Sequence, residues 1–221
     1  INNYVPQLMM GVVCVISYPM PDGKSGQQVV NNLQERVEML GAAKTGTFSV
    51  DCETYHATAT GANRMVHVLH NSQQPASCFA IVDTGTCLVA DNLFDLIMLK
   101  LKSYYASRKN SKVESKGQRY ELQDFAIKIG SVTIGQTMHF KGILVEVEYL
   151  PCMVPGECWH LMHEFMEGFM GIKIDNPPSY LKSKFDSVYT PSDTVQQYLE
   201  YFNIARKAVA STVAVATSAA R

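Results

Sequence analysis

The feature that most constrains the fold is a strict alternation of apolar and polar residues in two separate segments. In the segment TFSVDCETY (47–55), Phe48, Val50 and Cys52 alternate with polar neighbours. The segment 142–149 repeats the pattern, with apolar residues at 143, 145, 147 and 149. Because successive side chains of a strand point to opposite faces, this pattern predicts half-buried strands of an antiparallel sheet.

Other parts of the chain also have the composition of strands, and they come in groups. Short apolar or alternating runs lie at 10–18, 63–69, 77–83, 86–91, 111–116 and 119–129. Helical patterns stand between these groups and do not alternate strictly with single strands. This order predicts an α+β fold with a mainly antiparallel, barrel-like sheet of about eight strands and three to four packed helices.

Four segments have the spacing and end signals of helices. Ser25 and Gln28 form a capping box at the start of 25–41, and Gly41 ends it. A second helix is expected at 155–170, and Thr190 caps a final one. The segment 92–106 is apolar on most of its circumference. We therefore expect that helix to be buried on more than one side.

Composition and charge exclude several classes of protein. The net charge of −1 gives no general attraction to nucleic acid or anionic lipid, and no apolar run reaches the roughly 18 residues that span a bilayer. The six cysteines form no CxxC pair, which favours a soluble, reduced, intracellular protein. We expect one domain over 10–207, with a leader or cloning remnant at 1–9 and a disordered tail at 208–221.

The segment IVDTGT (81–86) has the form of an aspartic-protease catalytic loop around Asp83. Such enzymes need two carboxylates that share a proton, and this chain has one such triplet, so catalysis would require a symmetric homodimer. The competing interpretation is a hairpin whose turn uses Asp83, Thr84 and Gly85 for backbone reasons. We favour the turn and expect no catalytic residue here.

Two pairs of carboxylates lie two positions apart on predicted strands, Asp51 with Glu53 and Glu146 with Glu148. Each pair points to one face, and inside a barrel such a pair could bind a divalent metal. Tunnel-shaped metal triphosphatases carry Glu-x-Glu-x-Lys in this way. Leu150 stands here in the place of that lysine, so we expect no metal site and no triphosphatase activity.

Two further patterns have simpler explanations than a ligand site. Gly23-Lys24-Ser25 imitates a phosphate-binding loop, but Tyr18 stands where the pattern needs glycine, and Ser25 is explained as a helix cap. His160, His163 and Glu164 lie near Cys158 on one helix, where a solvated polar face is the favoured interpretation. His67 and His70 have no carboxylate or thiol at matching spacing. We therefore expect no cofactor and no metal.

Basic residues gather between positions 100 and 119. Seven of the nineteen lysines and arginines lie there, with Glu114 as the one acid. A solvated loop is the favoured interpretation, and a docking surface for an acidic partner is the alternative. The basic residues are Lys100, Lys102, Arg108, Lys109, Lys112, Lys116 and Arg119.

Several long segments, in order along the chain, resemble subunit 20 of the Mediator complex. They cover about residues 10–207, and such long ordered matches are far more specific than a three-residue motif such as Asp83-Thr84-Gly85. The tail 208–221 and residues 1–9 have no counterpart in that family. The segments are GKSGQQVV (23–30), EMLGAAKTGTFSVDCETYH (38–56), HVLHNSQQPASCFA (67–80), LVADNLFDLIMLKL (88–101), LVEVEYLPC (144–152) and QYLEYFNIARK (197–207).

The resemblance implies a barrel-like fold of about eight antiparallel strands with helices around it, similar in shape to the triphosphatase tunnel. It implies a non-catalytic subunit of the Mediator head module, paired with Mediator subunit 18 and anchored through subunit 8. The implied role is in the nucleus, as a coactivator subunit that transmits signals between activators and RNA polymerase II. Two enzyme hypotheses stay as alternatives, a homodimeric aspartic hydrolase through Asp83 and a metal-dependent triphosphatase through Glu146 and Glu148.

Overall fold

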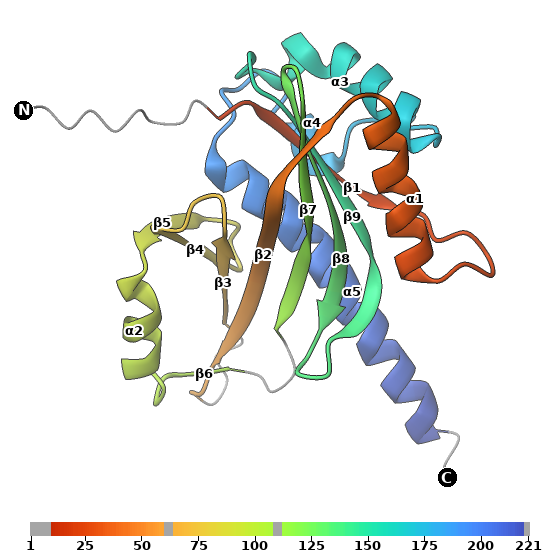
Figure 1. Ribbon diagram of the computed structural model, residues 1–221. Helices are drawn as coiled ribbons and strands as arrows, with labels where there is room; N and C mark the ends of the chain where they lie inside the picture. The colour runs from red at the N-terminus through yellow and green to blue at the C-terminus, as the bar shows by residue number, and fades with distance from the viewer. Residues whose placement is uncertain (1–9, 60–63, 108–111, 219–221) are drawn as a thin grey trace, which may run out of the picture.

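The computed structural model describes residues 10–59, 64–107 and 112–218, and the side chains as far as residue 208 (Figure 1). This part of the chain forms nine strands and five helices. The strands are β1 (Val12–Tyr18), β2 (Ala43–Ala57), β3 (Met65–Asn71), β4 (Ser77–Val82), β5 (Cys87–Asp91), β6 (Tyr105–Ser107), β7 (Val113–Leu122), β8 (Phe125–Ile134) and β9 (His139–Tyr149). The helices are α1 (Gly26–Met39), α2 (Leu93–Lys100), α3 (Pro155–Met170), α4 (Ser179–Ser183) and α5 (Pro191–Ser218).

All strand pairs are antiparallel, and the strands form one sheet in the order β1-β9-β8-β7-β2-β3-β4-β5, with β6 paired to β2. The predicted α+β class with mainly antiparallel strands is confirmed. Within the described residues the sheet is open, because β1 and β5 stand at its two ends and do not pair. The expected barrel-like sheet of about eight strands is therefore an open sheet of nine strands in this part of the chain.

The alternation in β2 separates the two faces of the sheet, as the sequence predicted. Phe48, Val50 and Cys52 are at most 2% exposed and point to what we call the inner face. Helix α5 covers this face and contacts β1, β2 and β4 (Figure 1). The opposite, outer face packs against α1 and α3, which contact β8 and β9. The long strands are therefore buried on both sides.

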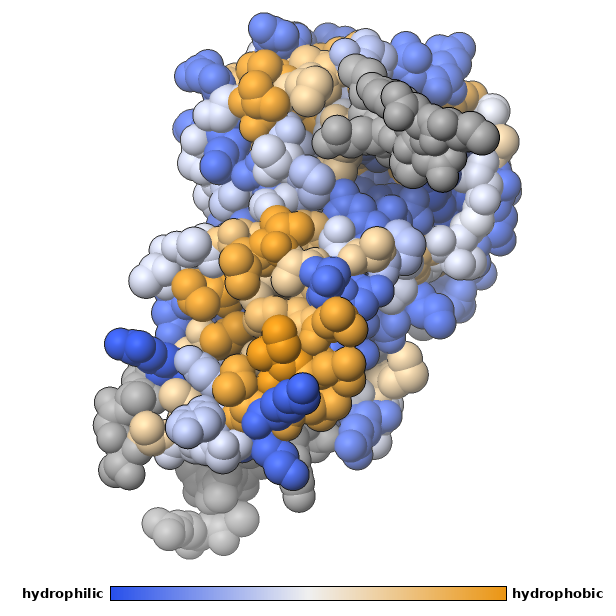
Figure 2. All heavy atoms as spheres, turned by 90° about the vertical axis from the view of Figure 1, so that its left-hand side faces the viewer, coloured by the Kyte–Doolittle hydropathy of each residue, from blue (hydrophilic) through white to orange (hydrophobic). Residues whose placement is uncertain are grey.

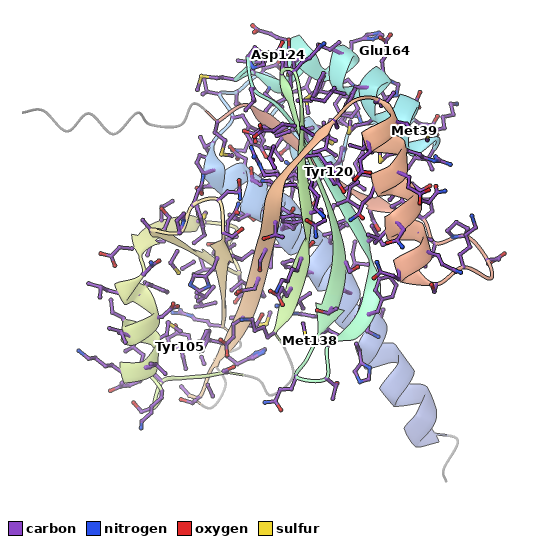
Figure 3. All side chains as sticks on the ribbon, in the orientation of Figure 1. Met39, Tyr105, Tyr120, Asp124, Met138 and Glu164 are labelled. Carbon is purple, nitrogen blue, oxygen red and sulfur yellow. The ribbon has the colours of Figure 1, made fainter. Side chains whose placement is uncertain are left out.

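Local sequence signals correctly predict where α1 begins and where α3 ends, the two helices that pack on the outer face. The Ser25 side chain accepts a hydrogen bond from the Gln28 backbone N–H, and Gln28 Oε1 accepts one from the Ser25 N–H, which completes the predicted capping box. Helix α3 ends at Gly171, whose φ of 65° is left-handed and suits glycine. Tyr120 stands on the sheet (Figure 3). Its hydroxyl donates a hydrogen bond to Glu38 of α1 at 3.1 Å.

Helix α5 begins after Thr190 as predicted but does not end near Lys207. It continues to Ser218, where the sequence analysis expected a disordered tail from residue 208. The physical reason is composition, since the segment is rich in alanine, the residue with the highest helix propensity. Residues 1–9, for which we expected a leader, and 219–221 lie outside the described part of the chain.

Helix α2 differs most from its prediction. It spans Leu93–Lys100 rather than 92–106, and Met98 is its buried residue. Met98 packs on the outer face of the sheet, against Val68 and Cys78. Phe94 is half-buried against the same cluster, whereas the other apolar side chains of the helix are exposed, so the expectation of burial on more than one side is wrong. Among the helices of the described residues, none combines the length and apolar character that crossing a membrane requires.

Candidate functional site

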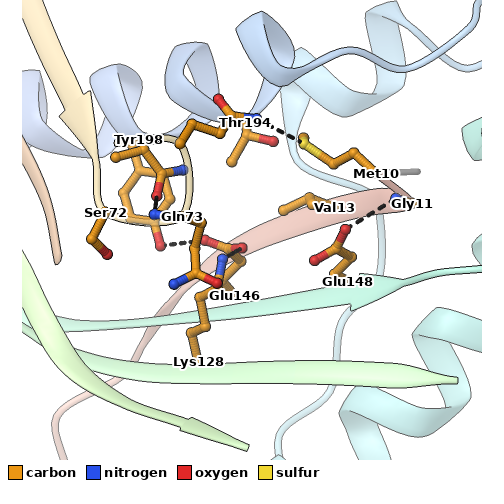
Figure 4. Close-up of polar contacts among 12 residues, drawn as sticks. Met10, Gly11, Val13, Ser72, Gln73, Lys128, Glu146, Glu148, Thr194 and Tyr198 are labelled. Atoms are coloured by element: carbon orange, nitrogen blue, oxygen red, sulfur yellow. Dashed lines mark hydrogen bonds and ion pairs between the residues drawn. The ribbon is translucent and has the colours of Figure 1, made fainter. Parts of the chain in front are cut away.

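A buried ion pair lies on the inner face of the sheet, where Lys128 of β8 and Glu146 of β9 stand opposite each other (Figure 4). The Lys128 Nζ lies 2.6 Å from Glu146 Oε1, and the Tyr198 hydroxyl of α5 donates to Oε2 at 2.6 Å. Both ionic side chains are at most 5% exposed. Burial, followed by the charge of Glu146, raises the pKa of Tyr198, so the phenol keeps its proton for this bond.

Glu148 lies on the same face, two residues further along β9, as the sequence predicted. It accepts a hydrogen bond from the Gly11 N–H at 3.0 Å. Burial is the main cause that raises the pKa of the Glu148 carboxyl, and the charge of Glu146 adds to it. Glu146, Glu148, Lys128 and Arg119 line a cavity of about 100 Å³ together with Met10, Val13, Asn71, Gln73, Gln74, Leu150 and Thr194.

The register of β8 and β9 changes the interpretation of the Glu-x-Glu pattern. The lysine that the Glu-x-Glu pattern lacks at Leu150 is supplied by the neighbouring strand, because the register of β8 and β9 pairs Lys128 with Glu146. Both oxygens of Glu146 already have partners within the chain. The carboxylate is therefore engaged in holding α5 to the sheet, and the geometry favours a structural role over metal binding.

Asp83 lies in the turn between β4 and β5. Its Oδ2 accepts a hydrogen bond from the Met65 N–H at 2.7 Å, and Gly85 has a φ of 83°. The Gly85 N–H closes the turn on the Val82 carbonyl at 2.8 Å. The Asp83 carboxylate is thus used to join the turn to the start of β3. These contacts favour the turn over the catalytic loop.

The candidate metal residues of α3 do not come together. His160 and Glu164 form an exposed pair with 3.6 Å between Nδ1 and Oε1. His163 instead faces the following loop, with its Nε2 2.6 Å from the Ile174 carbonyl. Cys158 is buried and donates to backbone carbonyls of its own helix turn. The solvated polar face is therefore the better description of this helix.

The basic segment does not form one continuous surface. Lys100 and Lys102 are exposed at the end of α2, and Lys116 is exposed on β7. Lys112 is engaged with Asp51 at 3.3 Å, while Arg119 points to the inner face and pairs with Glu121. Arg108 and Lys109 lie outside the described residues. Whether the segment docks an acidic partner stays a prediction.

One group of residues that the sequence analysis set aside is assembled by the fold. His70 lies between Asp51 and Cys78 in neighbouring strands, and Asp95 of α2 approaches it from above the sheet. The hydrogen bond to Asp51 is the main cause that raises the pKa of His70 to about 10. Spacing along the sequence hides this group, because strand register brings its members together.

An apolar patch lies over β5 and α2 on the face that Figure 2 shows. Six large hydrophobic residues of these two elements are exposed, and Leu93, Leu96 and Ile97 lie on one side of the helix at i, i+3 and i+4 spacing. β5 is also an end strand of the sheet. The apolar patch consists of Leu88, Leu93, Leu96, Ile97 and Leu99 together with Val89, which lies at the same edge of the sheet but points to the inner face.

Comparison with known proteins decides the family. A family model described as the TATA-binding related factor (TRF) of subunit 20 of Mediator complex matches residues 9–203. Mediator of RNA polymerase II transcription subunit 20 of Gallus gallus is 47% identical over 203 residues, which covers 90% of this chain and 95% of that protein. The chain belongs to the Mediator subunit 20 family. The protein of that name from Anopheles gambiae is 50% identical over 220 residues, or 93% of this chain and 99% of the relative.

Among solved structures, a Pyrococcus horikoshii protein is 11% identical with a TM-score of 0.45, covering 77% of this chain and 98% of its own. The family match is more informative about the sites. Residues 9–203 include the buried pair of Lys128 and Glu146 and also the whole apolar patch. Both features therefore lie in the part of the chain that the model of the Mediator subunit 20 family matches.

Proposed function

We propose that this chain is a non-catalytic structural and regulatory subunit of the Mediator coactivator, and that it acts in the nucleus by contact with other proteins. Membership of the Mediator subunit 20 family supports this role. The observation that carries the proposal in this structure is the apolar patch on β5 and α2. Large exposed apolar patches on otherwise well-packed domains mark sites where partners bind.

The patch has the composition of an interface core. Its leucines and isoleucine carry no charge, and Leu93, Leu96 and Ile97 are between 48% and 60% exposed. Lys100 and Lys102 stand at the end of the same helix, as a basic rim. Interfaces combine an apolar centre with a polar edge, so the fitting partner has an apolar surface with acidic residues where it meets these two lysines.

The proposed partners are Mediator subunit 18, as the other half of a heterodimer, and subunit 8, as the anchor to the head module. RNA polymerase II is contacted indirectly through that module. We assign no direct sequence-specific contact with nucleic acid, in keeping with the net charge of −1. The family resemblance supports these partners, and the patch supplies a surface of the kind that such a pairing needs.

Co-expression with Mediator subunits 18 and 8 from the same genome tests this assignment. The wild-type chain should co-purify with subunit 18 and elute with it as one species in size-exclusion chromatography. Leu96→Asp places a charge in the apolar patch and should weaken that association at least tenfold. Leu161→Asp on α3 is the matched control, since Leu161 is also an exposed helical leucine, 46% against 53%.

The non-catalytic part of the proposal has its own test. Wild-type protein should release no phosphate from a nucleoside triphosphate with Mn²⁺ or Mg²⁺, and it should cleave no peptide at acid pH. Phosphate release that disappears in Glu148→Gln would establish the triphosphatase alternative. Acid peptidase activity that disappears in Asp83→Asn would establish the hydrolase. Either result would contradict the proposal of a subunit that works through its surfaces alone.

A further inference from the structure

Three side chains form a row across the outer face of the sheet, beneath α2. The strand registers place Asp51 of β2 opposite His70 of β3, and His70 opposite Cys78 of β4. Side chains of residues directly opposite in antiparallel strands lie on the same face. Asp95, in the first turn of α2, extends down toward His70 and brings a second carboxylate to the row.

The donor atoms of this group converge. One nitrogen of His70, the Cys78 Sγ and one carboxylate oxygen of Asp95 all lie within 4.8 Å of one another. The Asp95 Oδ2 is 3.1 Å from His70 Nε2. Nevertheless, Nε2 is shielded from solvent and has no partner in hydrogen-bond geometry among the described residues. An imidazolium paired with Asp95 is one explanation for this nitrogen, and a cation bound between the imidazole, the thiol and the carboxylate is another.

The other nitrogen of the same ring is oriented by a carboxylate. His70 Nδ1 lies 3.4 Å from Asp51 Oδ1, and the second oxygen of Asp51 is 3.3 Å from Lys112 Nζ. In metal sites a histidine ligand commonly donates its other N–H to a carboxylate, which fixes the tautomer and directs the free nitrogen at the metal. Asp51 stands in that position relative to His70.

We propose that His70 Nε2, Cys78 Sγ and Asp95 Oδ2 bind a zinc ion. Imidazole, thiolate and carboxylate are the three ligand types that zinc takes in proteins, and a thiolate disfavours magnesium and calcium. The three ligands leave one of four tetrahedral positions for a water molecule or for a ligand from a partner. Cys78 lies in a small apolar cluster with Val68 and Met98, which shields the metal side of the row.

The zinc site would hold α2 to the sheet. Met98 is the buried residue of this helix, and its N-terminal Asn92 makes no side-chain capping bond. Coordination of the metal by Asp95, His70 and Cys78 would add an attachment to β3 and β4, besides the packing of Met98 and the hydrogen bond from Asn92 Nδ2 to the Pro75 carbonyl at 2.7 Å. Because α2 carries most of the apolar patch, zinc would stabilise the surface that we propose as the docking face. This consequence rests on the proposed function, whereas the zinc site itself does not.

Metal titration of the purified, chelator-treated full chain tests the site. Cobalt(II) is the probe, because a thiolate ligand gives it a charge-transfer absorption and a tetrahedral site gives it intense visible bands. Wild-type protein should bind one cobalt ion, develop both absorptions and lose them on addition of zinc. His70→Gln and Cys78→Ala should abolish the charge-transfer absorption. Asp51→Asn should weaken binding by about 10- to 100-fold, as a partner of a ligand.

Asp95→Asn is the decisive variant, because the Asp95 side chain is 48% exposed and its replacement should leave the fold intact. It should bind cobalt at least tenfold more weakly. Two matched controls should bind as wild type, Glu164→Gln at the exposed His160 pair and Cys87→Ala at a half-exposed thiol. Circular dichroism confirms folding of each variant.

Two results would overturn the site. One is a wild-type chain without a cobalt–thiolate absorption, which would leave His70 as an imidazolium between Asp51 and Asp95. The other is Asp95→Asn binding as tightly as wild type, which would place the metal elsewhere. Zinc binding without association with subunit 18 would count against the proposed function and not against the site. Association that is equal with and without zinc would remove the link between the two.

Discussion

Glu146 and Leu96 each stand in the environment that usually belongs to the other. The Glu146 carboxylate is 1% exposed inside the curved sheet, whereas the Leu96 side chain is 53% exposed on α2. The buried charge has all its partners within the chain, since Lys128 and Tyr198 bind its two oxygens. The exposed leucine has none. The inner face is therefore complete within the chain, while the apolar patch is the surface that we propose another protein covers.

The largest effect on stability should come from breaking the buried pair. Lys128→Met leaves the Glu146 charge buried with Tyr198 alone, and we expect unfolding to become easier by about 3–5 kcal/mol. Urea denaturation followed by circular dichroism measures this change. Lys116→Met, at an exposed position of the neighbouring strand, is the control and should stay within about 0.5 kcal/mol. A loss below about 1 kcal/mol for Lys128→Met would mean that water reaches the pair.

The second-largest loss of stability should come from replacing Gln197, because its side chain links α5 to β1. Its Oε1 accepts from the Val15 N–H at 3.0 Å, and its Nε2 donates to the Val13 carbonyl and the Tyr189 hydroxyl. Gln197→Ala leaves buried groups without partners, which costs about 1–3 kcal/mol. Gln196→Ala removes one exposed bond and should cost less. Equal losses in the two variants would show that the buried bonds are replaced by water.

Lowering the pH should reduce the stability of the folded chain through His67, which lies on the inner face. Burial is the main cause that lowers the pKa of His67 from 6.5 to about 4, and the positive charge of Arg206 adds to it. Between these values the unfolded chain binds a proton that the folded chain does not, so stability falls as the pH falls from about 6.5 to 4. Denaturation midpoints across this range should fall less in His67→Gln. If the denaturation midpoints of wild type and His67→Gln fell equally with pH, the lowered pKa of His67 would not be the cause of the loss of stability.

The smallest effect on stability should come from the apolar patch. Leu96→Ser removes an exposed side chain, so the free energy of unfolding should change by less than about 0.5 kcal/mol. The same variant should weaken association with subunit 18, whereas Lys128→Met, measured below its unfolding transition, should not. A destabilisation above about 1 kcal/mol in Leu96→Ser would mean that the patch supports the fold itself.

The features that could be predicted from the sequence are those that depend on residues close together along the chain. The capping box at Ser25 and the alternation of β2 are local patterns, and both are confirmed. Lys128 could not be assigned to Glu146, because their pairing depends on the register between two strands. The same holds for His70, whose partners come from β2, β4 and α2. Likewise, the apolar character of α2 was read correctly, but hydrophobicity alone does not say whether the cover comes from the same chain.

The bonds from Gln197 to the first strand also set the order in which the protein can be completed during synthesis. The Val15 N–H is made 182 residues before its partner, the Gln197 side chain. A ribosome that adds about 5–20 residues per second needs roughly 10–35 seconds to cover that distance. Throughout that time the inner face of the growing sheet, including the Lys128 and Glu146 charges once they are made, lacks its helix. A nascent chain of this family is therefore exposed to chaperones and proteases until its last helix has left the ribosome.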